Sequence, residues 1–407
     1  MEHFDVIILG AGASGLFCGM TAARRGKRVL LMDHAGKPGR KILVSGGGKC
    51  NFTNLESGAA HYVGHNAGFR KSALARFSPW DMVSLLSEAN IPWEERDLGQ
   101  LFCLQSAADV TRLLVDRCTG AGCVFHLGQA LDAVEHIPPG GETAGTANSV
   151  AGLYTVHSGD FAASAPKLVV ALGSGAWPQI GATEMGHRIA RRFGHKVYPA
   201  RPALVPLVMP PSWPLHGLAG ISLDVRITTA RTDGPGEASY VRSLLFTHRG
   251  ISGPAALCAS CHWDRGQVIR IDFVPQHDVR ALLDDTANGK LLVRTLISRL
   301  LPDRLAQRLT PPQIADRKVA ELPRKDREAL VGALTAHEVI PTGTEGMRKA
   351  EAAAGGVDVN EVSSRTMEST LQPGLYFTGE VLDVTGLLGG YNLHWAWASG
   401  KAAGEAI

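Results

Sequence analysis

The stretch FDVIILGAGASG (residues 4–15) decides the fold of this chain. It begins with an apolar run of strand length, and Gly10, Gly12 and Gly15 follow in the spacing GxGxxG. A helical stretch comes next, and the run KRVLLMD then predicts a second buried strand that ends at Asp33. This order predicts a β-α-β unit that binds a dinucleotide, with Asp33 accepting hydrogen bonds from the ribose of its adenosine half.

Each glycine of this unit has its own expected role. Gly10 permits the tight turn, Gly12 lets the pyrophosphate approach the backbone, and Gly15 lets the helix pack close to the strand. Ala13 and Ser14 lie within the same glycine run, and the N-terminus of the helix that follows it faces the phosphates with its free N–H groups and positive dipole end. FAD and NAD both use such a unit, so it does not choose between them.

The C-terminal run PGLYFTGEVLDVTGLLGGYN favours FAD. It predicts a strand over residues 375–378, an acidic turn, a glycine-rich loop and a final helix from about Asn392. FAD needs an acid for its ribityl hydroxyls and a helix N-terminus near the flavin, whereas a single NAD domain needs neither. The alternative interpretation of this run is an ordinary glycine-capped terminal helix that does not contact a cofactor. A third strand over residues 167–172 leads into another glycine turn, and the candidates from these segments are Gly173, Gly379, Glu380, Asp383, Gly389, Gly390, Tyr391 and Asn392.

The run SGGGKCNFTN (residues 45–54) places three glycines, a lysine and a cysteine in a segment that reads as neither helix nor strand. Glycines present backbone N–H groups without side chains in the way, so an anionic or bulky ligand could lie against them. A flexible surface loop is the alternative for this run taken alone.

The chain resembles the HI0933-like flavoproteins, a family of oxidoreductases with two dinucleotide-binding domains. The resemblance rests on GAGASG, GRKILVSGGGKCNFTN, LLFTHRGISGPAAL and AAGGVDVNEVSSRTMESTLQPGLYFTGEVLDVTGLLGGYN, and it covers most of the chain. Lys49 stands where the family usually has arginine, and ALGSGAWPQIG varies the family's usual turn. The resemblance implies that residues 45–54 wrap FAD, and the candidates there are Arg40, Lys41, Ser45, Gly46, Gly47, Gly48, Lys49, Cys50 and Asn51.

The fold class we expect is α/β, with a discontinuous Rossmann-type FAD-binding domain that receives two insertions. Residues 1–200 and 342–407 form the FAD-binding domain. Short alternating apolar runs predict a β-rich insert over residues 201–277 and 337–341, and helical spacing predicts helices over residues 278–336. The resemblance implies that these segments form a β-barrel-like domain and a small helical domain inserted into the FAD-binding fold.

The insert contains two motifs whose side chains could take part in catalysis or redox chemistry. His248 and Arg249 could face the flavin and bind or protonate a substrate, although a structural turn before a helix explains them equally well. Cys258 and Cys261 belong to a CxxCH motif, which attaches haem in exported proteins and forms redox dithiols elsewhere. We expect these two cysteines to pack in the interior, and no metal site is predicted.

The composition is that of a globular protein with two or three domains. Its 407 residues contain 45% hydrophobic and 19% charged residues, and the net charge of +3 is too small to indicate a nucleic-acid partner by itself. Glycines interrupt the apolar N-terminal run, which argues against a secretion signal, and no window is apolar enough to span a membrane. Seven scattered cysteines favour a reducing compartment, so we expect a cytoplasmic protein without a membrane partner.

The expected function is that of an FAD-dependent oxidoreductase that transfers a hydride to or from a small-molecule substrate. No second GxGxxG unit is present, so NAD(P)H binds transiently or the substrate itself reduces the flavin. One alternative is an RNA-base-modifying flavoenzyme, and another is a flavin-bearing binding or sensor protein without turnover. The RNA alternative requires a basic face on the insert, for which the helical segment offers Arg294, Arg299, Arg304, Arg308, Arg317, Lys318, Arg324, Lys325 and Arg327. The sequence specifies neither the substrate nor the oligomeric state.

Overall fold

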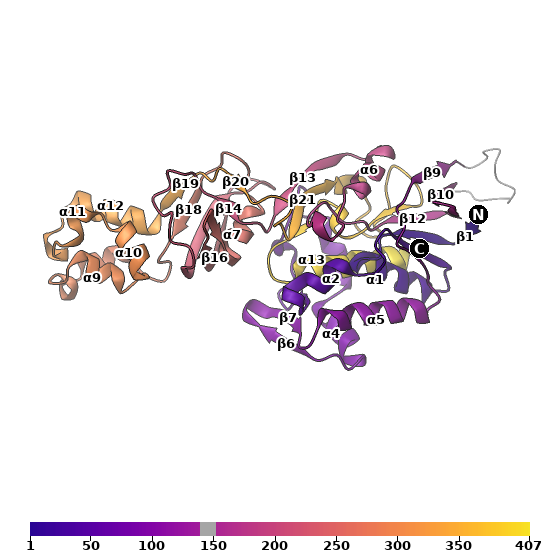
Figure 1. Cartoon of the computed structure of the whole chain (residues 1–407), viewed down its shortest axis with the longest axis horizontal. Coiled ribbons are helices and arrows are strands. Elements are labelled where there is room, and N and C mark those ends of the chain that lie inside the picture. The colour runs from indigo at the N-terminus through magenta and orange to yellow at the C-terminus, as the bar shows by residue number, and fades with distance from the viewer. Residues whose placement is uncertain (139–151) are drawn as a thin grey trace. The chain divides into compact units, whose positions relative to one another are not determined.

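The computed structural model describes residues 1–138 and 152–407 and divides into two compact units (Figure 1). Unit 1 consists of Met1–Arg201 with Ala352–Ile407, and unit 2 consists of Pro202–Glu351. Residues 342–351, which the sequence analysis assigned to the FAD-binding domain, belong instead to unit 2. The reason is that strand β20, within this segment, pairs with strand β14 of unit 2.

A five-stranded parallel sheet in the order β22-β12-β2-β3-β8 forms the centre of unit 1. Its middle strand, β2 (Val6–Leu9), consists of β-branched and leucine residues that are all fully buried, as expected for a parallel strand covered on both faces. Leu9 is in register with Met32 and with Val170, so the carboxyl ends of the strands meet at one edge. The other strands are β3 (Val29–Asp33), β8 (Val124–Leu127), β12 (Lys167–Val170) and β22 (Leu375–Phe377).

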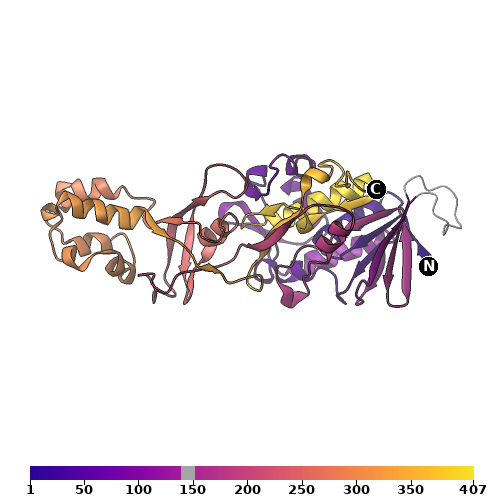
Figure 2. The same cartoon turned by 90° about the horizontal axis from the view of Figure 1, so that it is seen from above.

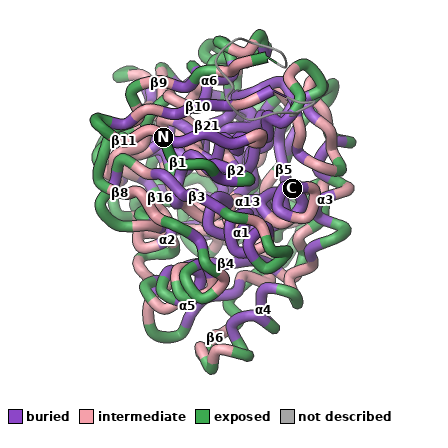
Figure 3. The backbone as a smooth tube through the Cα atoms, turned by 90° about the vertical axis from the view of Figure 1, so that its right-hand side faces the viewer, coloured by how far each residue is buried: buried purple, intermediate pink, exposed green. Residues whose placement is uncertain are grey.

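Two helices from opposite ends of the chain pack against each other, and the first of them also contacts this sheet. Helix α1 (Ala13–Ala23) contacts β2, β3 and α13 (Tyr391–Ala406), and α13 in yellow lies beside the indigo N-terminal elements in Figures 1 and 2. A side chain at Gly400 would meet the backbone oxygen of Ser14 at 2.5 Å, and Gly404 faces α1 in the same way. Glycine therefore brings the two backbones into close contact, and Figure 3 shows buried residues concentrated around these helices.

Smaller sheets complete unit 1, among them the two-stranded pairs β13-β21 and β23-β5. A four-stranded sheet in the order β1-β11-β10-β9 contacts the central sheet through β10 and β11. A three-stranded antiparallel sheet contains β4 (Asn51–Asn54), so the prediction that residues 45–54 form no strand was wrong for their second half, which pairs with β7. The remaining elements are β1 (Glu2–His3), β5 (Tyr62–Val63), β6 (Trp93–Arg96), β7 (Gln100–Cys103), β9 (Ala133–Ile137), β10 (Leu153–Ser158), β11 (Phe161–Ala165), β13 (Val197–Ala203), β21 (Ala352–Val357), β23 (Thr385–Gly386), α2 (Arg40–Val44), α3 (Arg70–Arg76), α4 (Pro79–Glu88), α5 (Ala107–Gly120) and α6 (Met185–Arg192).

Unit 2 is built on a seven-stranded antiparallel sheet in the order β19-β18-β15-β16-β17-β14-β20. Within the described residues this sheet is open, with β19 and β20 at its edges, rather than closed like a barrel. No helix of the described ranges is both long and apolar enough to cross a bilayer. The elements are β14 (Leu207–Val208), β15 (Ser222–Ala230), β16 (Glu237–Phe246), β17 (Gly250–Ser252), β18 (Ile269–Asp272), β19 (His337–Val339), β20 (Gly343–Thr344), α7 (Gly253–Ser260), α8 (Val279–Asp284), α9 (Val293–Ser298), α10 (Asp303–Leu309), α11 (Pro312–Ala315) and α12 (Arg324–Thr335).

Candidate flavin site

The glycine turn before α1 contains three glycines with different surroundings. Packing within the protein leaves no room for a side chain at Gly10 or Gly15, whereas it leaves room for one at Gly12. A side chain at Gly10, whose φ is 107°, would meet the backbone oxygen of Ala171 at 2.4 Å, and one at Gly15 would meet the oxygen of Gly10 at 1.9 Å. At Gly12, a Cβ would have no described atom within 4 Å. Gly12 is also the N-cap of α1, and no side chain caps this helix within the described residues. The helix thus begins at an open position where an anion can approach its N–H groups.

Asp33 lies beside this turn at the carboxyl end of β3. Its Oδ2 accepts a hydrogen bond from the backbone N–H of Ala11 at 2.8 Å, and its Oδ1 accepts one from Ala35 at 2.9 Å. The carboxylate is therefore oriented by the chain itself, with 16% of the side chain exposed. A carboxylate oxygen can accept more than one hydrogen bond, so Asp33 retains capacity for a ribose hydroxyl.

The Gly46–Gly48 segment adopts left-handed backbone conformations throughout, with φ values of 55°, 66° and 85°. A Cβ at Gly46 would meet the backbone nitrogen of Asn51 at 2.8 Å, so the loop itself requires this glycine. A Cβ at Gly47 or Gly48 would contact no described atom within 4 Å. These two glycines leave a bare, accessible stretch of backbone against which a planar or anionic ligand can lie.

The charged and thiol groups of the same loop are directed to protein partners. Lys49 donates from Nζ to the backbone oxygen of Leu104 at 2.5 Å. Cys50 is fully buried, and burial raises the pKa of its thiol well above the usual range, with Cys103 adding to the effect. Cys50 therefore stays protonated and is not placed to act as a nucleophile.

The loop at residues 45–54 packs against the start of α13. A Cβ at Gly390, the N-cap of α13, would lie 2.5 Å from the backbone oxygen of Thr53. Oγ1 of Thr53 lies 2.7 Å from Nδ1 of His394, and Trp397 donates from Nε1 to the oxygen of Phe52 at 2.8 Å. Two motifs from distant parts of the sequence therefore form one structure. The loop's Asn51, in the amide orientation that best satisfies its neighbours, also accepts a hydrogen bond from the N–H of Gly390 at 3.1 Å.

Glu380 connects three elements at the carboxyl edge of the central sheet. Its Oε2 lies 2.5 Å from Nζ of Lys41 on α2, and its Oε1 accepts a hydrogen bond from the N–H of Ala353 at 2.9 Å. Gly173, just beyond β12, lies next to the same carboxylate, because a Cβ there would be 3.8 Å from Oε2. Gly379 adjoins the start of α1, where a Cβ would be 2.7 Å from Oγ of Ser14. Arg40 lies apart from this cluster, beside Gly181 and His34.

Asp383 and Asn392 have protein partners that the sequence did not reveal. Asp383 is buried, and its Oδ2 accepts hydrogen bonds from His65, from the backbone N–H at 2.9 Å and from Nδ1 at 2.7 Å. The His65 ring stacks on Tyr198 with 3.7 Å between the ring centroids. Asn392 closes the turn at Gly386 by bonding both its N–H and its carbonyl at 2.8 Å. No spacing in the sequence connects His65 or Tyr198 with Asp383, so only the fold reveals this cluster.

The remaining candidates lie in unit 2. His248 and Arg249 are exposed in the turn between β16 and β17. Cys258 and Cys261 are fully buried in and directly after α7, and Cys261 contacts the backbone oxygen of Leu257 through Sγ at 3.7 Å. Ser252 precedes α7 without a side-chain capping bond.

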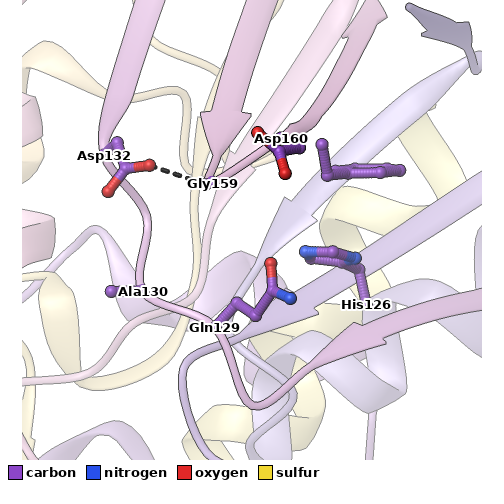
Figure 4. A pocket seen from close by; sticks show the side chains of 7 residues that line it. His126, Gln129, Ala130, Asp132, Gly159 and Asp160 are labelled. Carbon is purple, nitrogen blue, oxygen red and sulfur yellow. Dashed lines mark hydrogen bonds between the residues drawn. The ribbon is translucent and has the colours of Figure 1, made fainter.

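A cavity of about 660 Å³ lies at the ends of β8, β9 and β11 (Figure 4). The ring of His126 stacks on that of Phe161 with 4.1 Å between centroids, and Asp132 accepts a hydrogen bond from the N–H of Gly159 at 2.7 Å. None of the residues predicted from the sequence lines this cavity.

The residues around α1, the 45–54 loop and α13 suit a flavin dinucleotide. The open α1 N-terminus at Gly12 can receive a pyrophosphate, and Gly47 and Gly48 leave a second stretch of backbone accessible. A sequence model described as the HI0933-like protein Rossmann domain matches residues 4–406.

This chain belongs to the HI0933-like family.

The family resemblance inferred from the sequence is thereby confirmed. The HI0933-like chain has the α/β Rossmann-type fold of FAD-binding flavoenzymes, and its cofactor is a flavin. It is similar to two proteins named ribosomal RNA dihydrouridine synthase. The one from Escherichia coli is 43% identical, covering 100% of this chain and 98% of that protein. The one from Haemophilus influenzae is 42% identical, covering 100% and 99%.

A more distant relative is the 3-dehydro-bile acid delta(4,6)-reductase of Clostridium scindens. It is 28% identical, and the match covers 98% of each chain. The HI0933-like chain is a flavin-dependent oxidoreductase, which confirms the expectation of an enzyme and sets aside a sensor without turnover. The similarities favour the RNA-modifying alternative over the small-molecule substrate that the sequence analysis preferred.

Proposed function

We propose that this chain reduces uridine to dihydrouridine in ribosomal RNA, with FAD as its bound flavin. The observation that carries the proposal is the full-length similarity to the Escherichia coli protein named for this activity. The activity also accounts for a flavin site on a chain that carries extra basic residues in its insert. Ribosomal RNA is found in the cytoplasm, in agreement with the compartment expected from the cysteines.

The reaction adds a hydride and a proton across the C5–C6 double bond of the uracil ring. Reduced flavin, when bound, supplies the hydride equivalent. The chain's own residues bind and orient it: the α1 N-terminus at Gly12 receives the pyrophosphate, and Asp33 the adenosine ribose. Gly47 and Gly48 present bare backbone to the flavin, and Glu380, which contacts Lys41 and Ala353, accepts hydrogen bonds from the ribityl hydroxyls.

FAD is favoured over FMN because the β-α-β unit recognises an adenosine half that FMN lacks. Chromatography of the flavin released on denaturation distinguishes the two, and release of FMN would contradict the proposal. The chain contains no second GxGxxG unit, so its sequence does not reveal which nicotinamide nucleotide reduces the flavin. Anaerobic titration with NADH and with NADPH identifies the reductant.

The activity is tested by expressing the chain in an Escherichia coli strain whose own relative is deleted. Ribosomal RNA freed of transfer RNA is digested to nucleosides and analysed by mass spectrometry. We expect dihydrouridine in ribosomal RNA from cells with the wild-type chain and none with the Gly12→Val variant. Its absence from both would refute the proposed function.

A second candidate is the reduction of a small conjugated molecule, which the similarity to the Clostridium scindens bile acid reductase favours. The lower identity makes it the weaker candidate. Turnover of a 3-dehydro-bile acid together with unmodified ribosomal RNA would select it.

A further inference from the structure

The positive charge of this chain is concentrated in the helical part of unit 2. Residues 286–325 contain nine lysine and arginine residues and three aspartate and glutamate residues, whereas the whole chain contains 41 and 38. This segment therefore carries a larger positive excess than the net charge of +3 of the complete chain. Helices α9, α10 and α11 belong to it (Figure 1).

Only part of this charge is neutralised by neighbouring carboxylates. Arg294 forms an ion pair with Asp316 at 2.7 Å, and Lys318 lies 3.8 Å from Glu321. Arg317 lies 4.0 Å from Asp326. Among the described residues, the cations of this segment without a carboxylate oxygen within 4 Å are Lys290, Arg299, Arg304, Arg308, Arg324 and Lys325.

Helix α10 presents two of these unneutralised arginines side by side. It buries Leu305 and Leu309, so Arg304 and Arg308, one helical turn apart, are exposed together. Both guanidinium groups donate to backbone oxygens of the segment between β14 and β15, Arg304 to that of Gly217 and Arg308 to that of Pro214 at 3.5 Å. A carbonyl oxygen orients an arginine without cancelling its charge, and a guanidinium has further N–H donors available.

Arg299 adds a third exposed cation, at the end of α9 just before α10 begins. We call Arg299, Arg304 and Arg308 the α10 basic surface. Asp303 is the acidic residue in the first turn of the same helix. The surface therefore carries an excess of positive charge in the free protein.

Two other exposed arginines of unit 2 are paired with carboxylates. Arg280 forms two hydrogen bonds with the carboxylate of Glu328. Arg270 lies 3.3 Å from Glu237 and 3.7 Å from Glu338. These two arginines are therefore matched by carboxylates, unlike Arg299, Arg304 and Arg308 among the described residues.

We propose that the α10 basic surface binds the sugar-phosphate backbone of the RNA substrate. This inference rests on the proposed function and adds the surface on which the substrate docks. Arginine is suited to phosphate because its planar guanidinium can form two parallel hydrogen bonds with phosphate oxygens. Such contacts position an RNA and supply salt-dependent affinity, whereas they carry no base specificity of their own.

The test uses the complete flavin-loaded chain and three variants. The first combines Arg299→Gln, Arg304→Gln and Arg308→Gln. The second, the matched control, combines Arg270→Gln, Arg280→Gln and Arg294→Gln, which removes the same number of charges from ion-paired positions of the same unit. The third replaces the three residues of the α10 basic surface with lysine, which keeps the charge. Flavin content and urea unfolding verify that each variant folds.

Binding of a fluorescein-labelled oligouridylate is measured over a series of salt concentrations. We expect the first variant to bind at least tenfold more weakly at about 0.1 M salt, with a salt-dependence slope smaller by about two units, because each phosphate contact on a single strand contributes about 0.7. The control and lysine variants should bind like the wild type. Equal affinity of the first variant and the wild type would overturn the proposal, and so would equal losses in the first variant and the control.

Two further measurements separate this inference from related possibilities. If the first variant loses binding to vesicles of anionic phospholipid and keeps its RNA affinity, the surface serves a membrane and the proposal is wrong. Dihydrouridine formation by the wild type, measured as described above, reports on the proposed function alone. Wild-type dihydrouridine formation with unchanged RNA binding by the first variant would therefore refute the docking surface and leave the proposed function standing.

Discussion

Nζ of Lys41 lies 2.5 Å from Oε2 of Glu380, although 339 positions separate the two residues in the sequence. The other oxygen of the same carboxylate accepts a hydrogen bond from Ala353. This ion pair joins α2, which follows the first β-α-β unit, to the C-terminal segment that completes the site. The ion pair therefore connects two distant segments of the chain that contribute to the candidate flavin site.

Breaking this ion pair should affect the two partners unequally. Lys41→Met leaves the half-buried Glu380 carboxylate without its cation and should lower the free energy of unfolding by about 1–3 kcal/mol. Glu380→Gln keeps an oxygen for the Ala353 N–H, so its cost should be smaller. Urea unfolding of both single variants and the double variant should give a coupling energy of about 1 kcal/mol. Additive effects would show that the pair contributes nothing.

Gly12 and Gly15 should differ in what their substitution destroys. Gly12→Val places a side chain in open space at a φ of −85°, so the apoprotein should unfold like the wild type while flavin retention is lost. Gly15→Ala would force a Cβ to 1.9 Å from the oxygen of Gly10, so this variant should fail to fold stably. Flavin absorbance per protein and urea unfolding of the apoproteins measure the two effects. Wild-type flavin content in Gly12→Val would contradict the pyrophosphate assignment.

His394 should make the chain less stable in mild acid. The residue is fully buried, and burial lowers the pKa of its imidazole to about 4. The unfolded chain, with an ordinary histidine pKa near 6.5, binds this proton between pH 6.5 and 4 while the folded chain does not, so stability falls as the pH falls through this window. The loss attributable to His394 should be about 2 kcal/mol between pH 7 and pH 5.

The comparison with His394→Gln isolates this contribution, because His187, His195 and His337 also have pKa values lowered by burial. Urea unfolding of both proteins at pH 7 and pH 5 is the measurement. The variant should be less stable at pH 7, since Thr53 loses its partner, and should show a shallower pH dependence. Parallel pH profiles would exclude a buried neutral His394.

Cys258 and Cys261 should behave as packing residues. Both are fully buried in unit 2. The double variant Cys258→Ser, Cys261→Ser should keep its flavin, take up two reducing equivalents in an anaerobic titration, and lose about 1–3 kcal/mol of stability because buried thiols become hydroxyls. Uptake of extra reducing equivalents by the wild type that disappears in this variant would instead identify a redox dithiol.

The local part of the site could be predicted from the sequence. The strand, the turn at Gly10, Gly12 and Gly15, the helix and Asp33 lie within one short stretch, where spacing alone determines which residues share an element. The structure places them in a β-α-β arrangement with β2 and β3 parallel and adjacent. The secondary structure of residues 45–54 was predicted only in part. Residues 51–54 form a strand because they pair with β7, which lies almost fifty residues further along the chain.

The β-α-β unit, its glycine turn and the family can be predicted from the amino-acid sequence, because they depend on residues that are close in the chain. The contacts between distant groups become visible in the folded protein: Lys41 meets Glu380, Gly390 meets Thr53, and His65 meets Asp383. The structure likewise shows which arginines of unit 2 have a carboxylate partner, as Arg280 has, and which contact a backbone oxygen instead, as Arg304 does. The physical reason is that packing, hydrogen bonding and ion pairing act over a few ångströms in space, and spacing along the chain does not encode such contacts across hundreds of residues.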